Sequence, residues 1–221
     1  MSSNNTTRLE SLKQWSPTVF LIAGVLLFGY AIIQGIHTFT DVTVPTAFST
    51  AYGGIALLAP VFGLLGLYSR LRDHTPRLSL AGAVVTILSG ILTLLLLLQL
   101  VVTTIQMGGL PEVPADVPAW TAAALLLGFL LLAVSFLLFG LASLRTPVVS
   151  RTVALLLLVP AAAWFGLIVV NISGIIPTGT YLAVLAYTPI GIAVLAIGYL
   201  LKAESESSDR AEPAPTEARY S

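Results

Sequence analysis

The sequence has no cysteine and very little charge. Only 9% of its 221 residues are Asp, Glu, Lys or Arg, whereas soluble domains carry roughly 25%. So few charged side chains cannot coat a soluble surface. The absence of cysteine excludes disulfides, thiolate chemistry and metal sites built on cysteine.

Charge is also missing from the long apolar runs. The clearest run, 78–105, holds neither a charged residue nor a proline, and a bilayer core about 30 Å thick needs roughly 20 apolar residues in a helix. Five similar runs accompany it. The predicted spans are 17–36, 47–69, 78–106, 119–144, 152–176 and 181–201. The fold class predicted from them is an all-α integral membrane protein with six transmembrane helices.

No predicted span contains Asp, Glu, Lys, Arg or His. Proton relays, ion-coupled transporters and voltage sensors depend on such residues within the membrane. The two histidines, His37 and His74, fall in connections on opposite sides of the membrane, so they cannot act together on a haem or a zinc ion. No nucleotide-binding or hydrolase motif occurs either. We therefore expect a non-enzymatic protein without a cofactor and without a nucleic-acid partner.

The basic residues predict the orientation. All ten Lys and Arg residues lie in the two termini or in the connections 70–77 and 145–151, which share one side of a six-span protein. The opposite connections carry only Asp41, Glu112 and Asp116 as charges. Because cytoplasmic loops are enriched in Lys and Arg, we expect a multi-pass protein of the plasma membrane with both termini in the cytoplasm.

The ends of the chain differ in composition from the spans. Residues 1–14 are predicted to form a cytoplasmic N-terminal segment, and 15–202 the transmembrane domain. Residues 203–221 are acidic, contain Pro213 and Pro215, and have almost no apolar side chains. Such a segment buries too little apolar surface to offset the entropy of ordering, so a disordered cytoplasmic tail is predicted.

The short connections divide the six spans into three helical hairpins. Each hairpin follows a basic residue and carries one amide deep in its first span. The basic residues are Lys13, Arg77 and Arg151, and the amides are Gln34, Gln99 and Asn171. This pattern is explained either by an internal repeat or by convergence on one hairpin design.

The hairpin plan resembles that of small membrane proteins built from three two-helix repeats, such as the HdeD-type family. The composition, with Arg favoured over Lys, no cysteine and an acidic tail, is similar to that of small six-span haloarchaeal membrane proteins. These resemblances imply an archaeal source and a pseudo-symmetric helical bundle, but no particular activity.

Two sets of polar residues are candidate sites. The amides Gln34, Gln99 and Asn171 either line an outward-facing vestibule or cap helix ends at the membrane boundary. The second set is Arg70, Arg72 and Arg77. These residues either bind anionic lipid headgroups, at about 1 kcal/mol each, or only determine the topology.

The sequence leaves two functions open. The first is a structural, assembly or accessory role, with the lipid bilayer and other membrane proteins or copies of the same chain as partners. The alternative is a facilitator or permease for a neutral or lipid-like solute, with the three amides near its outer mouth.

Overall fold

The computed structural model of the chain describes residues 3–40, 42, 44–106, 119–173 and 180–211. These residues form six α-helices and no β-strand, so the predicted all-α fold is confirmed. The helices are α1 (Ser3–Phe39), α2 (Thr46–Leu71), α3 (Pro76–Gln106), α4 (Ala119–Leu144), α5 (Arg151–Ser173) and α6 (Thr180–Ala211).

All six helices are long and apolar enough to cross a bilayer. A helix suits this environment because it pairs its own backbone N–H and C=O groups where no water is present. The spans are Trp15–Phe39, Phe48–Leu71, Pro76–Thr103, Ala123–Leu144, Arg151–Val170 and Val184–Ser207, and each overlaps its predicted counterpart. The chain is a multi-pass membrane protein whose surface contacts the lipid bilayer.

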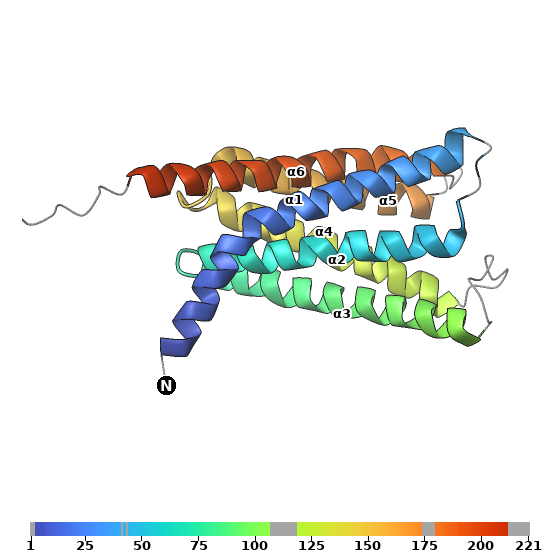
Figure 1. Ribbon diagram of the computed structural model, residues 1–221, viewed down its shortest axis with the longest axis horizontal. Helices are drawn as coiled ribbons and strands as arrows, with labels where there is room; N and C mark the ends of the chain where they lie inside the picture. Colours follow the sequence, from blue (N-terminus) through green and yellow to red (C-terminus); the bar gives the residue numbers. More distant parts are fainter. Residues whose placement is uncertain (1–2, 41, 43, 107–118, 174–179, 212–221) are drawn as a thin grey trace, which may run out of the picture.

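The helices follow one another around a closed ring. Each packs against its neighbours in sequence, and α6 returns to pack along α1. Helix α2 also touches α4, which places α3 towards the outside (Figure 1). Only 17% of the apolar window of α3 is buried, compared with 44% for α2 and α6. Helix α3 is therefore the one most exposed to lipid.

The two ends of the bundle differ in charge. The N-terminal turns of α1, the C-terminal turns of α6, and the α2–α3 and α4–α5 connections share one end, on the left of Figure 1. This end, the basic end, carries Arg70, Arg72, Arg145 and Lys202. The connection from α1 to α2 lies at the opposite end, which we call the far end.

The most extensive helix contact joins α1 and α6. A Cβ atom on Gly198 would lie 2.6 Å from the backbone nitrogen of Leu21, and one on Gly191 would lie 2.8 Å from that of Phe28. Only glycine allows the two backbones to approach this closely. The contact joins the first helix to the last rather than the two helices of one hairpin, and the internal repeat stays a prediction.

Every helix except α3 contributes large side chains to the centre of the bundle among the described residues. The large, fully buried side chains include Phe20, Leu64, Phe136, Trp164 and Ile197, which come from α1, α2, α4, α5 and α6. Helix α3 buries only small side chains among the described residues, namely Ser79, Gly82, Ala83, Thr86 and Ser89. Small residues allow this peripheral helix to approach its neighbours closely.

Both ends of the chain contain more helix than predicted. Helix α6 continues to Ala211, whereas residues from 203 onward were expected to be disordered. Extending an existing helix needs no new nucleation, and the Glu204 carboxylate interacts electrostatically with Arg70 of α2. Residues 212–221 lie outside the described part of the chain.

Helix α1 begins at Ser3, within the predicted N-terminal segment. Its first turns lean away from the bundle (Figure 1). Pro17 lies inside this helix and removes one backbone hydrogen bond, which explains a bend at this level.

Candidate functional site

A cavity of about 320 Å³ lies within the ring, in the half of the bundle towards the far end. It is bounded by α2, α3 and α4, with one residue each from α1 and α6. The lining residues are Tyr30, Thr50, Gly53, Gly54, Leu57, Thr93, Leu96, Leu97, Leu100, Leu125, Gly128, Phe129, Leu132 and Tyr187. None of these residues is charged, so the cavity suits a neutral molecule.

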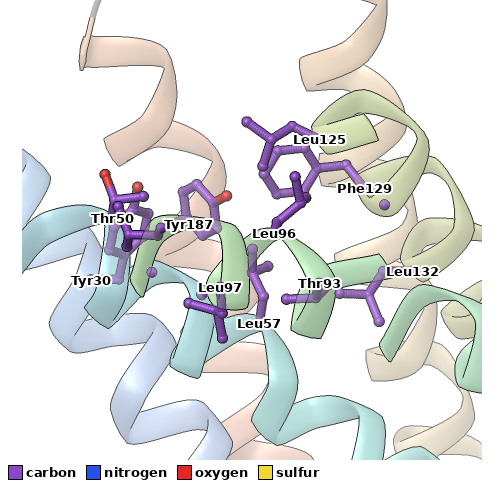
Figure 2. Close-up of a pocket in the computed structure, with 14 residues that line it drawn as sticks. Tyr30, Thr50, Leu57, Thr93, Leu96, Leu97, Leu125, Phe129, Leu132 and Tyr187 are labelled. Atoms are coloured by element: carbon purple, nitrogen blue, oxygen red, sulfur yellow. The ribbon is translucent and has the colours of Figure 1, made fainter. Parts of the chain in front are cut away.

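The polar atoms of the wall are concentrated on one side. Figure 2 shows the oxygen atoms of Tyr30, Thr50 and Tyr187 on one side, while leucines and Phe129 surround the rest. The rings of Tyr30 and Tyr187 pack edge to face, with their centroids 4.8 Å apart. This ring contact fixes two phenol groups from α1 and α6 beside each other.

Polar side chains lie beside the two phenols. Beside Tyr30, Gln34 Nε2 donates to Ser49 Oγ at 3.1 Å, and both of these side chains interact with the Tyr30 hydroxyl. Trp164 lies beside Tyr187, and its buried indole N–H forms no hydrogen bond with another of the described residues. The Tyr30 hydroxyl therefore has polar neighbours from α1 and α2, and Tyr187 has Trp164 of α5 beside it.

Three glycines line the cavity, and one of them, Gly128, leaves open space beside it. Gly53 and Gly54 line it from α2, and Gly128 lines it from α4. A Cβ atom on Gly128 would find only Leu92 Cδ2 within 4 Å, at 3.8 Å, which is an ordinary contact. The carbonyl of Gly128 accepts a hydrogen bond of 3.2 Å from Ser89 Oγ, which links α4 to α3 beside the cavity.

The predicted amide set does not form the described cavity. Gln34 is hydrogen-bonded to Ser49 and does not line the cavity. Gln99 does not line it either, and its Oε1 is buried without a hydrogen-bond partner among the described residues. Asn171 lies in α5, but its side chain is outside the described part of the structure. A vestibule shared by the three amides stays a prediction.

The predicted arginine set lies at the basic end, far along the bundle from the cavity. Arg70 is half-buried and interacts with Glu204. Arg72 forms an ion pair with its neighbour Asp73, with 3.4 Å between Nε and Oδ1. Arg77 is exposed. Binding of lipid headgroups by these residues stays a prediction.

Tyr30 and Tyr187 were not predicted as site residues. Tyrosines of membrane proteins are enriched at the two interfaces with water. Tyr30 and Tyr187 instead lie within their spans, and this position was the signal in the sequence that could have marked them. Their proximity depends on the packing of α1 against α6, which no local sequence pattern specifies.

Within the described residues, no group of three or more His, Asp or Glu side chains is placed to hold a metal ion. No protein-family profile matches the chain, and no curated protein or solved structure is significantly similar to it.

Proposed function

We propose that this membrane protein is non-enzymatic and that it is a facilitator or permease with a binding site for a neutral, lipid-like solute. The observation that carries this proposal is the uncharged cavity, with hydroxyl groups on one side and apolar side chains around the rest. Ligand sites are mostly apolar and hold a few polar groups that fix the orientation of the ligand.

The size of the cavity supports this proposal. Its volume of about 320 Å³ is about twice that of a 150 Å³ cavity that accommodates benzene, and it reaches the lower end of the 300–1,000 Å³ range of ligand pockets. A molecule of this size is a short apolar chain or a small ring system. A charged solute would lose its hydration without finding a counter-ion in the wall.

The proposed orientation places the cavity in the outer half of the plasma membrane. It follows from the basic end, which we assign to the cytoplasm because of its arginines. Since the chain has no cysteine, single cysteines at Thr40 and Ser150, both exposed, test this assignment. In intact cells an impermeant maleimide should label only the position at Thr40; labelling only the position at Ser150 would reverse the topology.

The binding proposal is tested with a photoactivatable alkyl ether in nanodiscs. Labelling of Leu57 and Leu132, which line the cavity, is compared with labelling of Leu94, which is 58% exposed on α3 and contacts lipid. We expect the cavity leucines to be labelled in the unmodified protein. Gly128→Leu should abolish this labelling by filling the cavity, while labelling at Leu94 persists.

Gly166→Leu is the matched control for this experiment. Gly166 is exposed on α5, and a Cβ atom there would meet nothing within 4 Å. Adding the same side chain at this exposed position does not touch the cavity, so labelling of Leu57 and Leu132 should be unchanged. Equal labelling in Gly128→Leu and Gly166→Leu would contradict the proposed function.

An accessory role is a second candidate because both terminal helices continue beyond their spans. Helix α1 extends from Ser3 to the span that begins at Trp15, and α6 ends at Ala211. These turns offer a helical surface at the basic end to another membrane protein or to a second copy. Removing residues 1–12 should then release a partner that co-purifies in mild detergent, and retention of that partner would contradict this role.

A further inference from the structure

We infer that the cavity takes an unbranched, single-chain amphiphile, whose alkyl chain enters from the far end and whose neutral polar group stays at the membrane boundary. A fatty alcohol has this chemistry. The inference rests on the proposed binding function and adds the shape, the orientation and the length of the ligand.

The cavity is elongated along the bundle. The lining residues of α2, α3 and α4 fall within 50–57, 93–100 and 125–132, and on each helix they recur at i, i+3, i+4 and i+7. This spacing is one face of a helix over two turns, or about 10 Å at a rise of about 1.5 Å per residue. A volume of about 320 Å³ over this length leaves a cross-section of about 30 Å². One extended alkyl chain fits so narrow a space, because neighbouring carbon atoms pack about 4 Å apart.

The end of the cavity towards the far end is open. Its rim includes Thr50, which is exposed, and Leu125, which is 41% exposed. These residues lie two positions inside the ends of the spans Phe48–Leu71 and Ala123–Leu144, so the rim is at the membrane boundary. A polar group at the rim stays in contact with water, whereas one placed deeper would lose its hydration.

The opposite end of the cavity is closed and apolar. Leu132 is 2% exposed, and Leu57 and Thr93 are half-buried. Figure 2 shows Leu57 and Leu132 below Leu125. The Thr93 hydroxyl donates to the backbone oxygen of Ser89 at 2.9 Å, so it is satisfied without a polar group from a ligand. This end therefore suits the end of an alkyl chain.

The two ends together determine the orientation and the length of the ligand. With its polar group at the rim, the chain runs towards Leu132 and lies along the bundle, as the neighbouring lipid chains do. An extended chain with C–C bonds of about 1.5 Å advances about 1.25 Å per bond, so about 10 Å corresponds to about eight carbons. A compact ring would leave one end of the cavity without dispersion contacts.

The orientation is tested in nanodiscs with two photoactivatable forms of octanol. One carries the diazirine near the end of the chain and the other carries it beside the hydroxyl. The first should label Leu57 and Leu132 at the closed end, and the second should label Leu100 and Leu125 near the rim, because only one orientation keeps the hydroxyl at the boundary. Leu94, which is exposed on α3, reports labelling from lipid in both cases.

The length is tested with a matched pair of variants. Straight-chain alcohols compete with the probes at equal concentration in the membrane, and competition should be strongest at about eight carbons. Leu132→Ala enlarges the closed end and should shift this optimum by about two carbons towards longer chains. Leu125→Ala makes the same change at the open rim and should leave the optimum unchanged.

The inference and the proposed function fail in different ways. The same labelled residues with both octanol probes, competition without an optimum in chain length, or equal shifts in the two variants would overturn the single-chain assignment and leave cavity binding intact. If Leu132→Ala does not fold, the labelled positions in the unmodified protein decide. Absence of cavity labelling by octanol overturns the inference if the alkyl ether still labels Leu57, and it contradicts the proposed function if the ether does not.

Discussion

A side chain added to Gly198, on the contact between α1 and α6, would strike the backbone of Leu21. A side chain added to Gly128, beside the cavity, would meet only the end of Leu92. Glycine thus allows close contact between two helices in one part of the bundle and leaves open space between helices in another. What differs is the group across from the glycine, which is a neighbouring backbone in the first case and the tip of a side chain in the second.

This difference shows how a bundle with no buried charged side chain among its described residues acquires a defined shape. Lipid tails are as apolar as leucine, so burial of apolar surface drives little association between helices, and close packing has to supply it. The α1–α6 contact supplies it through backbone approach. The α2, α3 and α4 helices pack through leucines and small residues, and this packing leaves room for a ligand.

The largest effect is expected at the α1–α6 contact. Gly198→Val should lower the free energy of unfolding by about 3 kcal/mol or more, since the new side chain collides with backbone that cannot move independently. Titration with a denaturing detergent in mixed micelles would measure this loss. Gly166→Val should stay within about 0.5 kcal/mol of the unmodified protein, because the site is open. Similar losses in both variants would mean that the close contact does not hold α1 to α6.

An intermediate effect should separate two glycines that both line the cavity. Leu97 of α3 packs directly over Gly54, whereas the position beside Gly128 is open. Gly54→Leu should therefore lower the free energy of unfolding by about 1–3 kcal/mol through overpacking. Gly128→Leu should leave it within about 1 kcal/mol. Equal destabilisation by the two variants in the same titration would show that the space beside Gly128 is not available.

The sequence was sufficient to predict the fold class and the approximate spans. The run 78–105 admits few alternatives to a membrane helix, because its length and lack of charge fit lipid and little else. The ends of the helices were harder to predict. Charged residues such as Glu204 suggested a disordered tail, yet α6 continues through them to Ala211. A partner on another helix, here Arg70, cannot be recognised from local composition.

The cavity was not predictable from the same signals. The spacing of polar residues in the apolar runs pointed to the amides Gln34 and Gln99, but neither lines the cavity. Tyr30 and Tyr187 are distant in sequence and meet only because α6 returns to α1. The role of each glycine likewise depends on the helix that faces it. The sequence around a glycine does not show whether it allows a close helix contact or leaves open space.

The smallest predicted effect concerns a hydrogen bond between helices. The buried Ser16 of α1 donates to the backbone oxygen of Gly63 in α2 at 3.3 Å. Ser16→Ala should lower the free energy of unfolding by about 0.6 kcal/mol, the average for such bonds in membrane proteins. Ser135 bonds within its own helix, to the Leu131 oxygen at 2.8 Å. Ser135→Ala should therefore change the stability less than Ser16→Ala does.

Together these variants rank backbone approach above side-chain packing and side-chain packing above polar contact. The ranking would be reversed if Ser16→Ala destabilised the protein more than Gly54→Leu in the same detergent titration. In that case the hydrogen bond from Ser16 to Gly63 would stabilise α2 in the bundle more than the packing of Leu97 against Gly54 does.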